Sequence, residues 1–215
     1  DVERSRGLGD VYKRQVVDNS SLRRGRITAN ALWGNAASVL TGDFLYTRAF
    51  QLMVELDNMQ ILRIMADTTN RIAEGEVMQL MLSHKADISE ETHMEVNQRK
   101  TAVLFSAAIE CACLLSGAET VQARDLAGYG LELGLAFQLA DDCLDYTANA
   151  VELGKEPGDD LAEGKYTLPL IHALRECDDD TRKRMVERIS SSGREAWSEV
   201  QKLIAETGGI TYTSR

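Results

Sequence analysis

The near absence of helix breakers is the feature that most constrains the fold of this chain. Only two prolines, Pro157 and Pro169, occur in 215 residues. Proline breaks the interior of a helix, whereas Ala, Leu, Met and Glu, which are abundant here, favour it. Aromatic and β-branched residues do not alternate over runs of strand length. The sequence therefore predicts an all-α fold, in one domain or at most two small ones.

Hydrophobic periodicity gives the expected helices. The long ones are expected at 31–56, 58–83, 89–117 and 121–146, and shorter ones at 168–176, 179–190 and 194–206. Ser89 is the predicted N-cap of the third helix. The fourth helix is the most apolar, so we expect it to be the most buried. A loop rich in Gly, Asp and Lys follows it, at 153–165.

The first fifteen residues differ from the rest of the chain. They are polar, lack helical periodicity and resemble translated sequencing-adapter read-through. We therefore expect residues 1–15 to be a non-native scar and residues 16–215 to form a partial domain.

Charge and composition exclude several classes of protein. A formal charge of −10 argues against a nucleic-acid partner, because binding to phosphate backbones needs a basic surface, but it allows a small anionic ligand. The four cysteines form no CxxC pair, and the three histidines lack metal-ligand spacing. No apolar run reaches membrane-spanning length and no secretory signal opens the chain, so we expect a cytoplasmic protein without a membrane span.

An acidic stripe near the end of the fourth helix is the main candidate for chemistry. Asp141 and Asp145 are four residues apart and share a helix face, with Asp142 beside them and Gln138 on the same stripe. Three carboxylates on an apolar helix repel one another and resist desolvation, and a hard cation would relieve both costs. Oxygen ligands without Cys or His favour Mg²⁺. Taken alone, a solvated helix end is the better reading of such a stripe.

Basic residues elsewhere in the chain could bind an anion. Paired arginines suit the bidentate binding of a diphosphate, and a lysine beside a hydroxyl supplies a point charge and a dipole. These groups are Arg23 and Arg24, which follow Asp18; Lys100 and Thr101; and Lys155 and Lys165, which flank the glycine-rich loop. Each alone is more often a surface feature. Together with the acidic stripe they predict a metal–diphosphate site.

Several ordered blocks resemble the trans-isoprenyl (polyprenyl) diphosphate synthase family. FQLADDCLDY and the downstream GKEPGDDLAEGKYTLPLI are similar to its second aspartate-rich region, and VVDNSSLRRGRITANALWGN to the end of its first. GDFLYTRAFQLM, EGEVMQL and RKTAVLF match further blocks in the family's order. The resemblance runs from Val16 to about Gly209 and is strongest to bacterial octaprenyl-type synthases.

This resemblance implies an isoprenoid synthase type helical bundle with a central cavity, incomplete here. It implies that isopentenyl diphosphate is condensed with an allylic diphosphate, farnesyl diphosphate or longer, to extend a trans-polyprenyl chain for quinone side chains. It also implies a homodimer and Mg²⁺. By position, the metal ligands would be Asp18, Asp141, Asp142 and Asp145. Arg23 and Lys100 would bind the allylic diphosphate, Arg24 isopentenyl diphosphate, Lys155 and Lys165 the leaving diphosphate, and Thr101 and Gln138 would line the cation.

The chain also departs from the family pattern. Arg14 and Gln15 stand where the first motif would have its first two aspartates, and the upstream and C-terminal parts of the family are missing. We therefore expect this polypeptide to be poorly active. Two alternatives stay open: a non-catalytic or regulatory subunit of a heteromeric prenyl synthase, and a class I terpene cyclase. The Asn-x-x-x-Ser-x-x-x-Glu motif typical of such cyclases is absent from the sequence.

Overall fold

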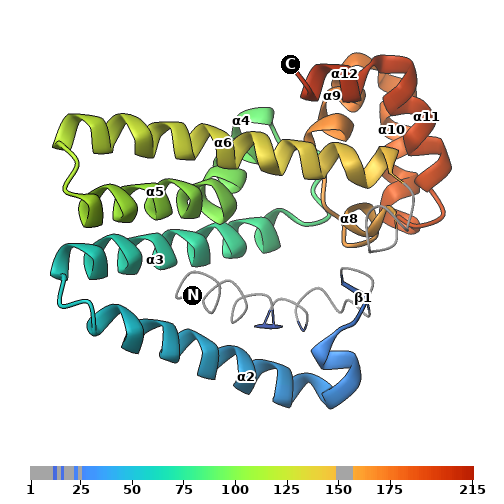
Figure 1. Ribbon diagram of the computed structural model, residues 1–215. Coiled ribbons are helices and arrows are strands. Elements are labelled where there is room, and N and C mark those ends of the chain that lie inside the picture. Colours follow the sequence, from blue (N-terminus) through green and yellow to red (C-terminus); the bar gives the residue numbers. More distant parts are fainter. Residues whose placement is uncertain (1–11, 14–15, 17–21, 24–25, 149–156) are drawn as a thin grey trace. The chain divides into compact units, whose positions relative to one another are not determined.

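The computed structural model describes residues 12–13, 16, 22–23, 26–148 and 157–215 (Figure 1). The chain divides into two compact units, residues 1–66 with 150–156, and residues 67–149 with 157–215. In the described ranges the regular structure is helical apart from one pair of two-residue strands. This confirms the predicted all-α class.

The first unit contains the strand pair and one long helix. β1 (Leu22–Arg23) pairs antiparallel with β2 (Arg26–Ile27), a segment too short to leave an alternating pattern in the sequence. α2 (Ala29–Val54) follows and is kinked at Gly34, whose φ of 82° is favourable only for glycine. The Ser38 hydroxyl in α2 donates to the backbone carbonyl of Tyr12, 2.7 Å away. This contact fixes α2 against the chain that precedes it.

α3 (Met59–Leu82) begins in the first unit, and its residues from Asp67 on belong to the second. Its start is capped by Asn58, whose Oδ1 accepts from the backbone N–H groups of Gln60 and Ile61, at 3.1 and 3.2 Å. The bounds differ by one residue at each end from those predicted.

The helix predicted at 89–117 is present but contains a wider turn. α4 (Glu90–Asn97) leads directly into the π-helical segment η1 (Gln98–Ala102), which leads into α5 (Val103–Ser116). Ser89 caps the start as predicted, its side chain accepting from the Thr92 amide at 3.1 Å. Gly117 ends the helix in the left-handed conformation. The extra residue of η1 changes which side chains face the neighbouring helices.

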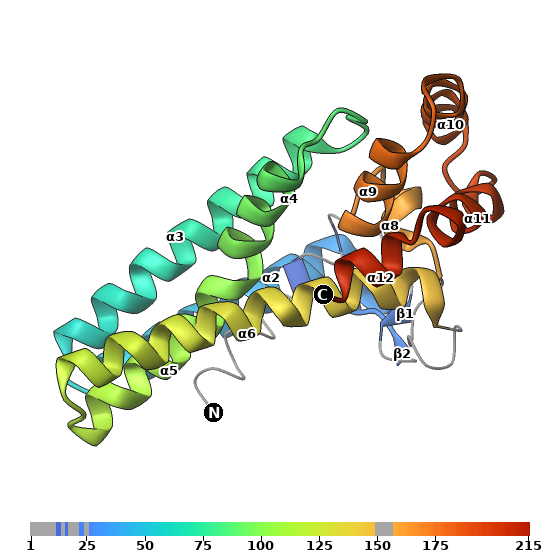
Figure 2. The ribbon, with the colours of Figure 1, turned by 90° about the horizontal axis from the view of Figure 1, so that it is seen from above.

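α6 (Thr120–Thr147) runs beside α5 and η1 in both ribbon views (Figures 1 and 2). The two helices approach closely at glycines: a Cβ on Gly134 would lie only 2.6 Å from Ala102 Cα. The expectation that α6 is the most buried helix was wrong. One face leaves its large apolar side chains exposed, at Val121, Leu126, Tyr129, Leu133, Phe137 and Leu144.

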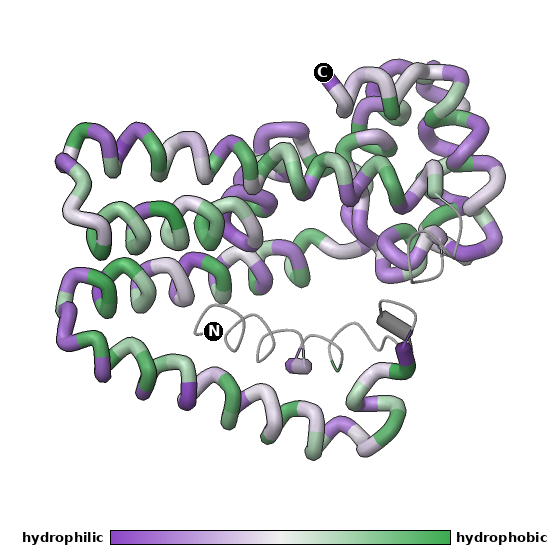
Figure 3. The backbone as a smooth tube through the Cα atoms, viewed as in Figure 1, coloured by the Kyte–Doolittle hydropathy of each residue, from purple (hydrophilic) through white to green (hydrophobic). Residues whose placement is uncertain are grey.

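The remaining helices enclose the main hydrophobic core of the second unit. They are α8 (Asp159–Ala162), α9 (Leu168–Glu176), α10 (Asp179–Ser191), α11 (Trp197–Thr207) and α12 (Gly209–Thr213). α9 has the predicted bounds, and α10 and α11 begin or end within three residues of theirs. Leu170, Val200 and Ile204 are among the fully buried core residues. In Figure 3 apolar and polar positions recur along these helices, as amphipathic packing requires.

None of the helices among the described residues is both long enough and apolar enough to cross a membrane. The four cysteines all lie in described segments and are free thiols. Burial raises the pKa of the Cys143 thiol.

Candidate functional site

A hydrogen-bonded chain of polar side chains connects α4, η1 and α6 within the second unit. We call it the polar chain; its members are His93, Asn97, Thr101, Gln138 and Asp142. The fold brings these five side chains together, and the hydrogen-bonded pair His93 and Asp142 is 49 residues apart in the sequence. The predicted site residues Thr101, Gln138 and Asp142 form one half of it.

Gln138 stands between a hydroxyl and a carboxylate. The Thr101 hydroxyl donates to Gln138 Oε1 over 2.9 Å, and Gln138 Nε2 donates to Asp142 Oδ1 over 3.0 Å. Since a carboxylate only accepts, the amide nitrogen must face Asp142 and the amide oxygen must face Thr101. The two oxygen dipoles predicted to face a cation are therefore held in a defined orientation.

The other half of the polar chain is buried. His93 Nε2 lies 2.9 Å from Asp142 Oδ2 and 2.9 Å from the Asn97 side-chain amide. His93, Asn97 and Asp142 are only 8, 5 and 2% exposed. An ionised carboxylate cannot donate, so Nε2 carries the proton and donates to Asp142. A protonated Nε2 cannot accept a hydrogen bond, so the Asn97 amide must turn its oxygen, not its nitrogen, toward this N–H. Both oxygens of Asp142 thus receive a hydrogen bond, one from each helix-borne neighbour.

The π-helical segment directs consecutive residues to different helices. Thr101 faces Gln138 on α6, whereas Lys100 donates to Gln79 Oε1 on α3 and lies 3.9 Å from a carboxylate oxygen of Glu76. α3 comes close at Gly75, where a Cβ would lie 2.6 Å from the Lys100 amide nitrogen. π-helical segments within α-helices are rare and are often found at functional sites. Lys100 is therefore placed by α3 and Thr101 by α6.

The end of α6 is anchored by Tyr146, and this positions the acidic stripe. The Tyr146 ring stacks on Trp197 with centroids 5.2 Å apart, and its hydroxyl accepts from Thr167 Oγ1 over 3.2 Å. Burial raises the pKa of this phenol well above its usual value. Of the neighbouring carboxylates, Asp145 is fully buried and Asp141 is partly exposed.

Lys165 lies in the loop after α8 and forms ion pairs with acidic residues of α8 and of that loop. Its ammonium group pairs with Asp160 at 3.4 Å and with Glu163. The loop is attached to the α3–α4 connection, where the His84 amide donates to the Gly164 carbonyl over 2.8 Å. The role of Lys165 in diphosphate binding stays a prediction.

Four of the predicted site residues have no described side chain. Asp18, Arg24 and Lys155 lie outside the described residues, as do Arg14 and Gln15. Arg23 is in β1, opposite Arg26, but its side chain is not described.

The donor chemistry of the acidic stripe fits a hard cation. Within the described residues, His, Cys, Asp and Glu form no group of three or more that could hold a metal ion by themselves. Mg²⁺ is commonly held by one or two carboxylates together with substrate phosphate oxygens, so three protein ligands are not required. Asp141 is the most exposed of the three, since Asp142 and Asp145 are buried.

Sequence reasoning missed His93, Asn97 and Gln79. A signal was present: His93 and Asn97 are four residues apart, as are Gln138 and Asp142, so each helix carries a polar pair on one face. That the two faces meet could not be known from local spacing.

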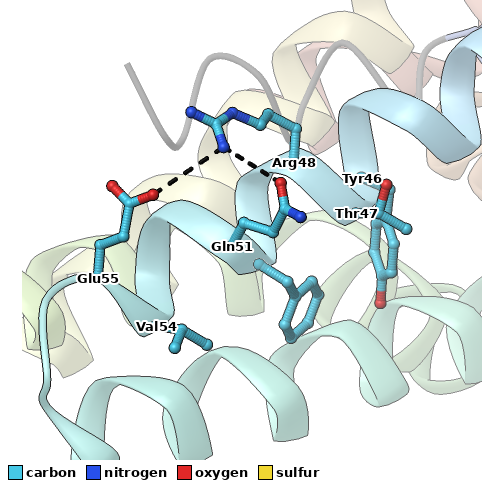
Figure 4. A pocket seen from close by; sticks show the side chains of 7 residues that line it. Tyr46, Thr47, Arg48, Gln51, Val54 and Glu55 are labelled. Carbon is cyan, nitrogen blue, oxygen red and sulfur yellow. Dashed lines mark hydrogen bonds and ion pairs between the residues drawn. The ribbon is translucent and has the colours of Figure 1, made fainter.

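Two surface hollows are lined by residues outside the polar chain. One, of about 610 Å³, follows α2 and is lined by Tyr46, Phe50 and Val54, with Arg48 hydrogen-bonded to Gln51 at 3.1 Å (Figure 4). The other, of about 1050 Å³, lies between the start of α4, α9 and α10. The predicted site residues that the structure describes line neither of them.

Curated relatives are prenyl diphosphate synthases. The chain is 52% identical over 198 residues to the octaprenyl diphosphate synthase of Haemophilus influenzae, covering 92% of this chain and 60% of that protein. It is 55% identical over 159 residues to the octaprenyl diphosphate synthase of Escherichia coli, covering 74% of this chain and 49% of that protein. The chain thus spans about half to three-fifths of the length of these relatives.

Solved structures share the fold. The polyprenyl synthase of Caulobacter crescentus, crystallised with calcium and isoprenyl diphosphate, matches 99% of this chain and 65% of its own length, at 42% identity and a TM-score of 0.92. A decaprenyl diphosphate synthase of Rhodobacter capsulatus matches 99% of this chain and 66% of its own, at 39% identity and a TM-score of 0.89. Residues 15–207 match the family described as polyprenyl synthetase. The chain belongs to the polyprenyl synthetase family.

Proposed function

We propose that the protein is a Mg²⁺-dependent transferase that condenses isopentenyl diphosphate with an allylic diphosphate to extend a trans-polyprenyl chain. The observation that supports this best is the bonded series Thr101–Gln138–Asp142, which joins the π-turn carrying Lys100 to the acidic stripe. Cation-stabilising oxygens, a lysine and carboxylates are thereby found within one unit. The names of the relatives point to the same class of reaction.

The roles proposed for the described residues follow from their chemistry. The Lys100 ammonium, held by α3, would bind the diphosphate of the allylic substrate. The oxygens of Thr101 and Gln138 would face the positive charge that develops when the allylic C–O bond breaks. Asp141, with Asp142 and Asp145 completing the stripe, would hold Mg²⁺, which when bound neutralises the charge of the departing diphosphate.

The proposed reaction needs no reactant besides the allylic diphosphate and isopentenyl diphosphate. As the allylic C–O bond breaks, the electron pair leaves with pyrophosphate. The double bond of isopentenyl diphosphate supplies the electrons for the new C–C bond, and a proton is then lost to pyrophosphate. Apolar side chains of α6, among them Leu133 and Phe137, would line the path of the growing tail and exclude water from it once the tail covers them.

Asp18, Arg23, Arg24, Lys155 and Lys165 complete the proposed site by resemblance. A homodimer, a cytoplasmic location, a product for quinone side chains and farnesyl diphosphate as the allylic substrate remain predictions. So does the low activity of this polypeptide, which rests on Arg14 and Gln15 at the first acidic motif.

Product analysis tests the proposal. The purified chain is incubated with farnesyl diphosphate, labelled isopentenyl diphosphate and Mg²⁺, and the products are separated by chain length. We expect slow formation of longer prenyl diphosphates and release of pyrophosphate, abolished by a chelator and by Asp141→Asn. A hydrocarbon formed from the allylic diphosphate alone would indicate a cyclase. Activity that appears only after a second, different chain is added would indicate the non-catalytic subunit.

A further inference from the structure

His93 and Asn97, in the buried half of the polar chain, have no role in the chemistry described so far. His93, Asn97 and Asp142 are each more than nine-tenths buried, between α4 and α6. Burying polar groups costs free energy unless they are hydrogen-bonded. Here the hydrogen bonds run from His93 through Asp142 to Gln138.

Asp142 links the two halves of the polar chain. Its Oδ2 receives the His93 Nε2–H at 2.9 Å and its Oδ1 receives the Gln138 amide at 3.0 Å. A carboxylate held at one oxygen by a buried ring has little freedom to rotate. Its second oxygen therefore presents a fixed acceptor to the Gln138 amide.

The orientation of the Gln138 amide depends on this acceptor. Of the two orientations of the amide, only one puts Nε2 toward Asp142 and Oε1 toward Thr101, where a hydroxyl donates over 2.9 Å. If Asp142 turned away, the amide would lose the partner that distinguishes its nitrogen from its oxygen. His93 would thus influence Gln138 without touching it.

We propose that His93 is a positioning residue that orients the Gln138 amide through Asp142. The inference rests on the proposed synthase function for its consequence in catalysis, but the hydrogen-bonded arrangement itself does not. It gives Asp142 a task within the protein in addition to its proposed place among the metal ligands.

Two substitutions separate the ring of His93 from its hydrogen bond. His93→Phe keeps a buried ring and removes the donor, whereas His93→Gln removes the ring but places an amide N–H at the same number of bonds from Cβ. The matched control is His172→Phe, because His172 is also buried, at 9% exposed, and contacts Arg175 and Tyr212 rather than the polar chain. His93→Leu serves if the larger ring prevents folding, which circular dichroism would show.

The first readout needs neither substrate nor metal. The Gln138 side-chain amide is observed by ¹⁵N NMR, its signal assigned by its loss in Gln138→Leu. In His93→Phe we expect hydrogen exchange of this amide to become at least about tenfold faster, the effect of losing one hydrogen bond, with recovery in His93→Gln and no change in His172→Phe. An unchanged signal in a folded His93→Phe, or an equal change in His172→Phe, would overturn the proposal.

The second readout is kinetic. We expect kcat to fall about tenfold in His93→Phe while KM for isopentenyl diphosphate stays within about twofold, and kcat to recover in His93→Gln. A normal kcat despite an altered amide signal would refute the positioning role. If the amide responds as expected but the unmodified chain shows no turnover, the proposed function fails while the arrangement around Gln138 stands.

Discussion

At the scale of single residues, burial determines the chemistry at the end of α6. Tyr146 follows directly after the acidic stripe and is enclosed by Trp197 and Thr167. Burial is the largest cause that raises the pKa of its phenol, and nearby carboxylates, led by Asp160, raise it further. The neutral phenol is therefore favoured in the folded protein.

This predicts a pH dependence of stability that Tyr146→Phe should remove. Because the folded-state pKa is raised, the contribution is fully present below the unfolded value of about 10 and is lost as the pH rises above it. At pH 8 the variant should be less stable by about 1 kcal/mol, since Thr167 loses its acceptor. Between pH 8 and pH 11 this difference should shrink, as urea unfolding would show.

The control for this measurement is Tyr129→Phe, which alters an exposed phenol. A difference between the unmodified chain and Tyr146→Phe that stays constant over the whole pH range would contradict the prediction.

At the scale of elements, the π-helical segment η1 packs against a glycine on each of two neighbouring helices. Gly75 on α3 approaches the Lys100 amide, and Gly134 on α6 approaches Ala102. Because both helices come this close, η1 can hydrogen-bond to each of them, through Lys100 to α3 and through Thr101 to α6.

Gly134→Ala should therefore destabilise the second unit. Its Cβ would lie 2.6 Å from Ala102 Cα, and overpacking of this kind costs about 1–3 kcal/mol. Gly128→Ala is the matched control on the same helix, where a Cβ meets nothing within 4 Å, so it should be neutral or stabilise by up to about 1 kcal/mol. Equal effects of the two substitutions on the free energy of unfolding would contradict this packing.

A local test of the helix start is Ser89→Ala. Ser89 Oγ accepts from the Thr92 amide at 3.1 Å, and loss of an N-cap costs about 1 kcal/mol. Ser191→Ala, at the end of α10, changes a serine whose hydroxyl bonds to the Arg188 carbonyl instead of capping a helix start, and should change the unfolding midpoint much less. A loss of equal size in both variants would argue against the cap.

At the scale of the whole molecule, the sequence predicted most of the helices and half of the site. α9 was predicted to the residue because Pro169 suits a first helical turn and its apolar positions are regular. α8 and α12 were missed because four or five residues are too short for a periodic signal. The π-helical segment η1 was missed because one extra residue barely alters the spacing of apolar residues along a long helix.

The site was predictable where its residues are neighbours along one helix. Gln138 and Asp142 could be placed together from their spacing. Lys100 and Thr101 could be named from their chemistry, and their roles came from the family resemblance. The contact of His93 with Asp142 joins residues 49 apart, and only tertiary packing brings them together. The exposed apolar face of α6 was also unforeseen, because apolar composition does not say which face the rest of the chain covers.

We propose above all that η1 and the acidic stripe of α6 bind an allylic diphosphate together with Mg²⁺. Titration calorimetry with farnesyl diphosphate, in Mg²⁺ and in chelator, tests this most directly, because it does not depend on turnover. We predict binding that requires Mg²⁺ and is weakened at least about tenfold in Asp141→Asn, since a charge-assisted ligand is lost. Equal affinity with and without Mg²⁺, or unchanged affinity in Asp141→Asn, would contradict it.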